Sequence, residues 1–524
     1  MAITEYSLLD RGYLPRELPP PFRSRTLAAA IHANSGGLPV TFTQNPPPEA
    51  WPATYKVARQ GTLRRKLGIP NPINQVGLNR EIIASWSTLT RLTAQSRLSK
   101  SRPIEGRYRA ITPEVSQADL YPIRLRVRRG AKFVLHADVS QFYGSIYTHA
   151  IAWAVHGKAN AKPPAARRTN TLGNRLDKWV RNGQGQQTIG VPIGPDTSFV
   201  IAEIIGCAID REVLRRKRNA RGYRRMDDQE YGFATRDEAE FMLGALQDAY
   251  AEYELVLNPL KTYIEDLPGP LEARWVTELR MTPSGRNWVG QRYGLITLFD
   301  RAFEYARQSP EEAVLNYALG ITERRRIAPE NMSLYQDLLV QCLTLEAGTI
   351  RNVLRQLRVL RSSGFTLDSD ILQEVLGNLI RIHAQQGHSS EVAWALWSSI
   401  ELNIPVASNA INVLTRMNDS VVALIALDCQ KRGLIPASAV FGQWHAMMKS
   451  DELWGPNWLL AYEANVKGWL PSVGSADHVN ADPAFRLLKS WRVTFYQRNR
   501  RLVPRPGIPG TQRRRRRTPP PEGY

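Results

Sequence analysis

Hydrophobic residues follow two different periods along this chain of 524 residues. Between about 130 and 266 they form short continuous runs that predict buried strands, and these runs alternate with segments of helical period. From about 310 to 470 they recur at intervals of three and four, which predicts one helix after another. The chain is therefore expected to join a mixed part of helices and strands to an all-helical part.

The mixed part has a definite expected order of elements. Apolar residues at 200, 201, 204, 205, 208 and 209 have helical spacing and follow a loop rich in Gly and Pro. The full expectation is a strand at 133–137, a helix at 144–157, a polar loop with room for one helix at 158–185, a long helix after the Gly/Pro loop, a helix at 236–254 and a strand at 262–266.

The all-helical part is expected to be a stack of antiparallel helices. Short polar breaks such as "QQGHSS" and "LNIPVAS" separate its apolar segments, and no fixed-period repeat is visible. One segment carries apolar residues at Ile371, Leu372, Val375, Leu376, Leu379 and Ile382. The predicted fold class is thus α+β, followed by an α-helical repeat domain.

The two ends differ from the rest in composition. The first 50 residues are rich in proline, as in "ELPPPF" and "NPPPEA", which excludes long regular elements. The last residues, "RPGIPGTQRRRRRTPPPEGY", have the composition of a disordered tail. The expected divisions are a Pro-rich arm at 1–50, a mixed domain at 51–300, a helical domain at 301–485 and a basic tail at 486–524.

The net charge of +21 is concentrated at the two ends. Residues 1–130 carry +12, residues 486–524 carry +11, and the remainder is close to neutral. Such a distribution favours a polyanionic partner, most commonly nucleic acid. The plainer interpretation is that the charge serves solubility.

Three features concern the cellular compartment. Cys207, Cys342 and Cys429 are widely spaced and form no disulfide framework or CxxC pair, which favours a reducing environment. The first residues lack the basic and apolar pattern of a signal peptide, and no apolar run has the roughly eighteen residues of a membrane span. We therefore expect a cytoplasmic protein without a membrane partner.

Two adjacent carboxylates, Asp227 and Asp228, interrupt a strand-like sequence between "YRRM" and "EYGF". Two strands joined through a pair of aspartates predict a hairpin with carboxylates at its tip. By itself this pattern is also typical of an ordinary structural turn. Asp138, however, ends the apolar run at 133–137. If the two strands are neighbours, three carboxylates meet at one sheet edge, where two Mg²⁺ ions would offset their repulsion and support phosphoryl chemistry.

Four motifs in order give these carboxylates a wider context: "ADVSQFYGSI", "GVPIGPDTS", "RMDD" and "LNPLKT". Together they resemble the palm of reverse transcriptases. The segments "FYGSIYTHAIAWAVHGK" and "GHSSEVAWALWSSIELNI" resemble the bacterial abortive-infection, or defence-associated, reverse transcriptases. The resemblance implies a right-hand palm and fingers core with a helical domain, and a role in antiphage defence. Some members of that family build DNA without a conventional template, and some attach it to a protein hydroxyl.

The resemblance also implies roles for individual residues. Asp138, Asp227 and Asp228 would bind the two Mg²⁺ ions, and Tyr143 would lie under the sugar of an incoming deoxynucleotide. Lys261 would act on the leaving pyrophosphate, and Gly190, Pro192 and Gly194 would let the backbone approach the nucleotide. The alternatives are core packing for Tyr143, a solvent-exposed lysine for Lys261 and an ordinary loop for the Gly/Pro block.

"YPIRLRVRRG" spaces Arg124, Arg126 and Arg128 by two, which on a strand would place them on one face. From a fingers strand they could reach a triphosphate, or equally the phosphates of a nucleic-acid backbone.

Two positions depart from the pattern of the resembled family. Arg225 stands where an aromatic residue usually precedes x-Asp-Asp, and Ile193 stands where the Gly/Pro block often has glutamine. The departures leave two-metal chemistry intact and argue against ordinary templated copying. We expect Mg²⁺-dependent DNA synthesis from dNTPs. The alternatives are an RNA-templated reverse transcriptase with a partner non-coding RNA, and an idle nucleic-acid-binding scaffold. A homo-oligomer is compatible with the helical domain.

Overall fold

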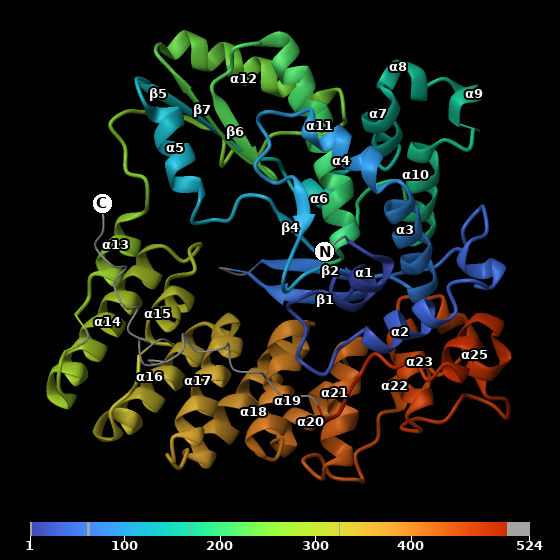
Figure 1. The fold of residues 1–524 in the computed structure, drawn as a ribbon. Helices are drawn as coiled ribbons and strands as arrows, with labels where there is room; N and C mark the ends of the chain where they lie inside the picture. The colour runs from blue at the N-terminus through green and yellow to red at the C-terminus, as the bar shows by residue number, and fades with distance from the viewer. Residues whose placement is uncertain (1–2, 60–62, 168, 284, 324, 500–524) are drawn as a thin grey trace, which may run out of the picture.

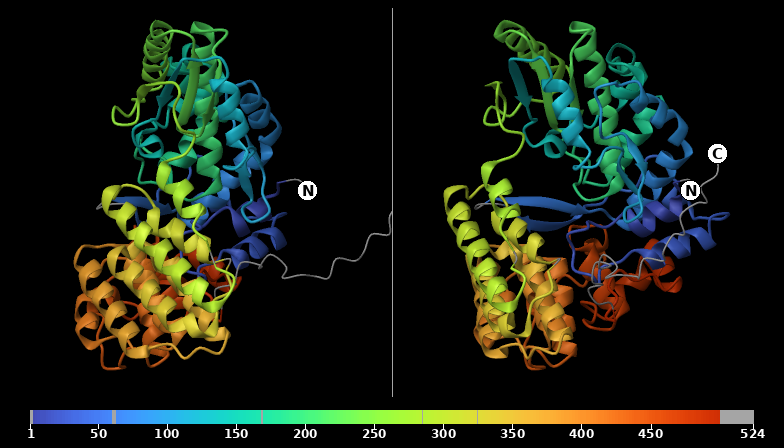
Figure 2. Two further views of the ribbon diagram at one scale, coloured as in Figure 1. Left: turned by 90° about the vertical axis from the view of Figure 1, so that its left-hand side faces the viewer. Right: turned by 60° about the vertical axis from the view of Figure 1, so that its left-hand side comes forward.

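The computed structural model describes residues 3–59, 63–167, 169–283, 285–323 and 325–499. It has a mixed α and β fold with small antiparallel sheets and many helices, as expected. One part contains the largest sheet and the helices around it. The other is a curved row of helices, which lies beside the first part in both views of Figure 2.

The largest sheet has four antiparallel strands in the order β6-β7-β5-β8. Their bounds are Gly222–Arg225 for β6, Asp228–Phe233 for β7, Phe133–Ala137 for β5 and Tyr263–Asp266 for β8. The apolar run of β5 makes it a central strand, paired with β7 and β8. The strands predicted at 133–137 and 262–266 and the hairpin predicted around Asp227 are therefore confirmed.

Helices cover both faces of this sheet. Leu135 of β5 belongs to a core with residues of α11 (Asp196–Arg216) and α12 (Arg236–Ala251). The next residue along the strand, His136, faces the opposite side, where α5 (Leu120–Arg128) packs against β7. Figure 1 shows α5 beside the strands near one end of the sheet. The long helix after the Gly/Pro loop and the helix near 236–254 are confirmed.

Short elements connect the sheet to a two-stranded hairpin, β1 (Ala53–Ala58) and β2 (Arg64–Ile69). After the hairpin come α3 (Pro72–Ala84), α4 (Trp86–Ala94) and the strand pair β3 (Pro103–Glu105) and β4 (Ile111–Pro113). The region from 142 to 182 forms α6 (Phe142–Ser145), α7 (Ala150–His156), α8 (Lys158–Ala161), α9 (Pro164–Arg167) and α10 (Leu172–Asn182). The single helix expected at 144–157 is thus divided into α6 and α7, and the region expected to hold at most one helix at 158–185 contains three.

Helix follows helix after β8, as predicted for about 310–470, and the helices begin earlier and end later than that range. Its members are α13 (Arg274–Arg280), α14 (Trp288–Gln308), α15 (Val314–Thr322), α16 (Met332–Leu345), α17 (Ile350–Ser362), α18 (Ser369–Gln385), α19 (Ser389–Leu402), α20 (Ser408–Leu414), α21 (Ser420–Lys431), α22 (Gly442–His445), α23 (Trp458–Val466), α24 (His478–Ala481) and α25 (Pro483–Ser490). The boundary predicted at 300 falls inside α14. The hairpin β1–β2 packs against α19, so the helices share a core with the chain before the sheet.

Both ends of the described chain enter this shared core. The Pro-rich arm forms α1 (Glu5–Arg11) and α2 (Arg25–Ala33), and Phe22 makes a backbone bridge with Tyr496. Phe495 and Tyr496 are fully buried. The prediction of a disordered tail from 486 is therefore wrong for 486–499, because these aromatic side chains fill the core between the arm and α23. The arginine run 513–517 lies outside the described residues.

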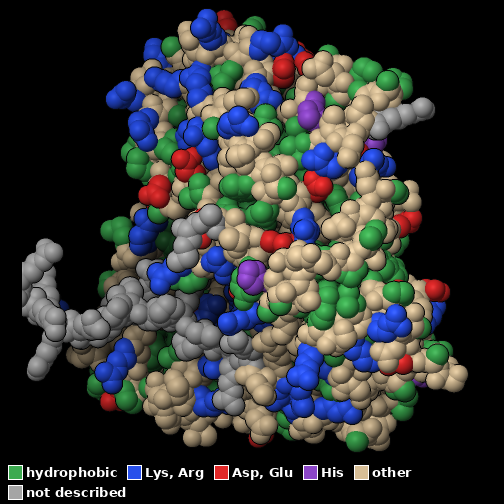
Figure 3. Space-filling view, turned by 45° about the vertical axis from the view of Figure 1, so that its right-hand side comes forward, with side chains coloured by type: hydrophobic (Ala, Val, Ile, Leu, Met, Phe, Trp, Pro, Cys, Tyr) green, Lys and Arg blue, Asp and Glu red, His purple; other side chains and the backbone are tan. Residues whose placement is uncertain are grey.

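Basic side chains are frequent on the sheet-containing half of the surface, in the upper part of Figure 3. The three cysteines are buried and unpaired. In the described part of the chain no helix is both long and apolar enough to cross a membrane.

Candidate active site

The antiparallel pairing of β5 and β7 brings the three aspartates together. Ala137 of β5 pairs with Gln229 of β7, so the next pair in this register is Asp138 with Asp228. Asp227 is the second residue of the two-residue loop that joins β6 to β7. Asp138 is buried and Asp228 is exposed, so the group opens to solvent on one side. The convergence predicted from two separate sequence segments is present.

Burial, and then repulsion between these carboxylates, changes their protonation. Burial, and then the charges of Asp227 and Asp138, raises the pKa of Asp228 to about 6. Burial, followed by the charge of Asp138, also raises the pKa of Asp227. Without a bound cation, ionisation of all three carboxylates is therefore unfavourable.

Lys261 supplies one positive charge to the group. Its Nζ lies 2.8 Å from Oδ2 of Asp138, and this hydrogen bond is the main reason why the pKa of Lys261 is raised. Lys261 lies in the turn just before β8, and half of its side chain is exposed. The ammonium group thus places one positive charge directly against Asp138.

Tyr143 and Gly190 lie at the edge of the same site. Burial, and then the charge of Asp227, raises the pKa of Tyr143. The backbone oxygen of Tyr143 accepts a hydrogen bond from Val191 N–H, and Gly190 N–H donates to the oxygen of Ile146. Gly190 has a φ of 91°, which glycine adopts without strain. The Gly/Pro block therefore begins beside Tyr143.

Pro192 and Gly194 pack against the β1–β2 hairpin and the N-terminal arm rather than against Tyr143. A Cβ atom on Gly68 of β2 would lie 2.8 Å from Pro192, and one on Gly194 would lie 2.6 Å from Pro15. Gly68 N–H donates to the oxygen of Ile193. These contacts join the block to the hairpin and to the N-terminal arm. A packing role explains Pro192 and Gly194 without a nucleotide.

The predicted strand of arginines is wrong, because residues 120–128 form α5. On this helix Arg124 and Arg128 are one turn apart and form ion pairs with Glu230 of β7, while Arg128 also reaches Glu265 of β8 at 3.1 Å. Arg126 points to the other side, is exposed and donates to the oxygen of Pro122. Two of the three arginines thus attach α5 to the sheet.

A cavity of about 340 Å³ adjoins Asp138 and Asp228, whereas Asp227 is not among its lining residues. Its walls come from the sheet, from α5 and from the turn before β8, and they combine carboxylates with basic and aromatic side chains. The residues most relevant to a ligand are Asp138, Asp228, Lys261, Arg225, Arg124 and Tyr263. Arg225 therefore faces the space in front of the carboxylates.

Arg65 is a functional candidate that the sequence analysis did not identify. It is exposed on β2, and its positive charge partly opposes the rise in the pKa of both Asp227 and Tyr143. The hairpin thus carries a guanidinium close to the carboxylates. The "RRK" sequence at 64–66 was visible, but many arginines recur between 51 and 130, and only the fold shows which one approaches the site.

A second cluster, also missed, lies between β2 and the helical part. In the described residues the one group of three with metal-like spacing is His383, His388 and Glu391, whose ligand atoms lie within 4.8 Å of one another. The carboxylate oxygens of the three aspartates are not gathered within 4.8 Å of one another in this way. Arg64 Nη2 lies 2.7 Å from Glu391 Oε1 and 3.1 Å from His388 Nδ1. A guanidinium therefore already stands where a cation would bind.

No family model and no curated protein matches this chain. The function is therefore inferred from the geometry and chemistry of the site.

Proposed function

We propose that the chain is a Mg²⁺-dependent nucleotidyltransferase of the reverse-transcriptase type, which synthesises DNA from dNTPs. One observation carries the proposal: Asp138, Asp227 and Asp228 come from two distant segments and converge where the two inner strands of an antiparallel sheet, β5 and β7, meet at one end. Burying and gathering repelling carboxylates costs stability, which is reasonable at a site that binds cations and at odds with a purely structural turn. In this proposal the sheet is the palm and the β1–β2 hairpin belongs to the fingers.

The residues present fit a magnesium site. Carboxylate oxygens are the ligands that Mg²⁺ prefers, and substrate phosphates commonly complete its coordination. Lys261 already holds a positive charge against Asp138. When bound, a pair of Mg²⁺ ions would activate the attacking hydroxyl and neutralise charge on the phosphates. The ions would need to draw the three carboxylates closer together than they are here.

The protein's own side chains would then position the substrate. Tyr143 lies near Asp227 and could pack beneath the sugar of the nucleotide. Arg65, on the hairpin, could bind the triphosphate through charge-assisted hydrogen bonds. Lys261 could move from Asp138 to the pyrophosphate as it leaves and neutralise its charge.

The test uses purified full-length protein, Mg²⁺ and each labelled dNTP, without added nucleic acid. Asp227→Asn is the control, because it removes one charge at nearly constant volume. Product that depends on Asp227 supports the proposal. Product that disappears after RNase treatment would identify a co-purified RNA as template, and product that enters a gel only after protease treatment would identify a protein primer.

Absence of product under every condition, also with added primers and RNA, would contradict the proposal and favour a nucleic-acid-binding scaffold.

The proposed setting in antiphage defence has a separate test. Cells that express the Asp227→Asn protein at normal levels should lose protection against a phage that the wild-type protein resists. Protection that survives this substitution would separate the defence role from polymerisation.

A further inference from the structure

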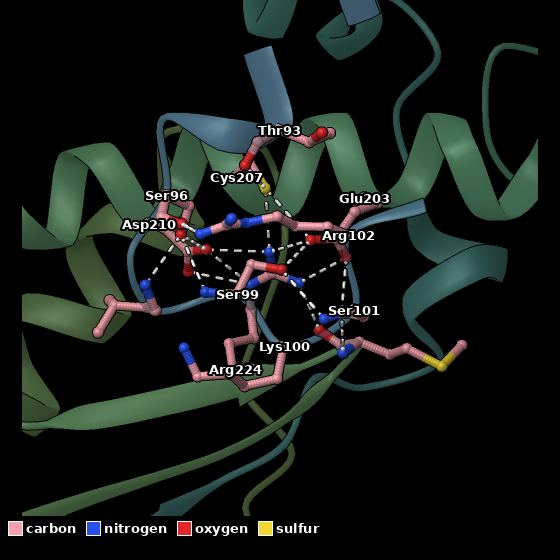
Figure 4. Close-up of polar contacts among 12 residues, drawn as sticks. Thr93, Ser96, Ser99, Lys100, Ser101, Arg102, Glu203, Cys207, Asp210 and Arg224 are labelled. Atoms are coloured by element: carbon pink, nitrogen blue, oxygen red, sulfur yellow. Dashed lines mark hydrogen bonds and ion pairs between the residues drawn. The ribbon is translucent and has the colours of Figure 1, made fainter. Parts of the chain in front are cut away.

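Arg224 is a fully buried arginine directly behind the aspartate loop. It belongs to β6, and its side chain reaches from this strand toward α11, as Figure 4 shows. Its Nη2 lies 2.8 Å from Glu203 Oε1 and 2.9 Å from Asp210 Oδ2. Glu203 and Asp210 are seven residues apart on α11, so two turns of helix put both carboxylates on the face toward the sheet. Both carboxylates are also fully buried.

A row of serines completes the network from the opposite side. Ser96 donates to Asp210 at 2.6 Å, and Ser99 and Ser101 donate to the two oxygens of Glu203 at 2.5 and 2.8 Å. The same segment pairs with β6, because Arg224 N–H donates to the oxygen of Leu98 and the oxygen of Arg224 accepts a hydrogen bond from Lys100 N–H. These hydroxyls offset the excess of two carboxylates over one guanidinium.

Stability alone does not explain such a cluster. Buried ion networks are often no more stabilising than apolar residues of the same volume, whereas their directional bonds specify geometry. The network is therefore expected to hold a particular part of the molecule in place.

The network ends on Met226, the residue before Asp227. Ser101 Oγ accepts a hydrogen bond from Met226 N–H at 2.8 Å, and Arg224 Nη1 donates to the oxygen of Met226 at 3.0 Å. Both backbone polar groups of this residue are thus bound by the network. Met226 has a φ of 58°, a left-handed conformation that is unfavourable for a residue with a side chain.

We propose that Arg224 and Ser101 are positioning residues, which hold Met226 in this conformation and thereby fix Asp227 and Asp228 for cation binding. The inference deepens the proposed function and rests on it. It assigns to the buried network a second role besides packing, because a loop free to relax would let the carboxylates move apart.

Ser101 and Ser99 form a matched pair for the test. Both are buried and both donate to Glu203, but only Ser101 also binds the loop. Mn²⁺ binding is measured by electron paramagnetic resonance on full-length Ser101→Ala, Ser99→Ala and wild-type protein, with Asp227→Asn as the blank. Circular dichroism and thermal unfolding establish that each variant is folded. We expect Ser101→Ala to weaken the Asp227-dependent Mn²⁺ affinity about tenfold and Ser99→Ala to change it less than twofold.

Met226→Gly in the Ser101→Ala background gives a second, independent readout. Glycine enters the left-handed region without strain, so the double variant should recover most of the lost Mn²⁺ affinity. The double variant is also informative if Ser101→Ala alone is too unstable to study. Equal affinities in Ser101→Ala and Ser99→Ala, or no recovery with glycine, would overturn the positioning role.

Wild-type protein without Asp227-dependent Mn²⁺ binding would instead contradict the proposed function. The two failures are thus distinguishable.

Discussion

Asp228 carries the clearest consequence of gathering three carboxylates. Its pKa of about 6 lies above the ordinary value of 3.8, so its charge is unfavourable in the folded protein. Below pH 3.8 the group is protonated whether the chain is folded or not, and it costs nothing. As the pH rises through 6 the folded protein must accept the charge, and stability is lost.

Asp228→Asn should therefore stabilise the metal-free protein at neutral pH. Because Asp228 is exposed and its interactions are screened, we expect a gain of about 1 kcal/mol at pH 7.5 that disappears toward pH 4. Urea unfolding in EDTA between pH 4.5 and 8 measures it. In Mg²⁺ the order should reverse, since the wild-type protein gains from metal binding. A gain independent of pH would contradict the electrostatic explanation.

Arg65 should act on nucleotide binding. Arg65→Gln removes the charge that reaches Asp227 and Tyr143, and we expect about a tenfold higher KM for dNTP with kcat little changed. Lys66→Gln is the matched control, because the next residue of β2 points to the other face of the hairpin. Steady-state incorporation kinetics distinguish the two variants. Equal effects would indicate a general loss of charge.

At the scale of elements, apolar pattern predicted those parts whose period is unambiguous. The continuous run of β5 and the helical spacing of α11 each had one consistent interpretation. "YPIRLRVR" did not, because its alternation fits a strand while Arg124 and Arg128 also lie one helical turn apart. Their partners Glu230 and Glu265 are over a hundred residues away, and only those long-range ion pairs show that the segment is a helix.

The residues of the candidate site likewise fall into those that the sequence could identify and those that it could not. Asp138 and the Asp227–Asp228 pair could be identified because each follows or interrupts a recognisable strand. Arg65, Arg224 and Ser101 could not, because their roles depend on contacts between elements that sequence spacing does not specify. Pro192 and Gly194 belong to the predicted block but serve the packing of the hairpin.

The contact between β2 and the helices α18 and α19 should make the protein sensitive to acid. Burial is the main cause of a lowered pKa at His383 and His388, Arg64 lowers both pKa values further, and Glu391 opposes this shift. A depressed histidine pKa means that the folded protein binds fewer protons, so stability falls as the pH drops below 6.5.

His383→Gln should therefore lose less stability than the wild-type protein between pH 7.5 and 5, by about 1 kcal/mol. Thermal unfolding across that range measures the difference. Parallel curves for the two proteins would show that the histidine does not titrate in this contact.

At the scale of the whole molecule, the two halves are joined by buried contacts rather than by a free linker. Trp458 Nε1 donates to the oxygen of Ile69 in the hairpin, and Trp394 Nε1 donates to the oxygen of Glu17 in the arm. The described C-terminal residues Phe495 and Tyr496 complete the same core. The helical part therefore supports the hairpin that carries Arg65 toward the aspartates.

This arrangement predicts different outcomes for two truncations. Ending the chain after Asn499 removes eight arginines and one glutamate but leaves Phe495 and Tyr496 in place. We expect an unchanged unfolding temperature and weaker binding to single-stranded DNA. The DNA affinity should also depend less steeply on salt concentration, because binding would release several fewer counterions. Ending it after Trp491 removes the buried aromatic pair and should lower the unfolding temperature markedly, since each such side chain is worth about 3–5 kcal/mol.

Differential scanning fluorimetry and DNA titrations at several salt concentrations separate the two effects. A tail that contributes only solubility would leave both the DNA affinity and its salt dependence unchanged in the shorter truncation. Equal stability of the two truncated proteins would contradict the role assigned to Phe495 and Tyr496. Because those side chains lie between the N-terminal arm and the helices, their loss should also reduce dNTP incorporation without any change at the aspartates.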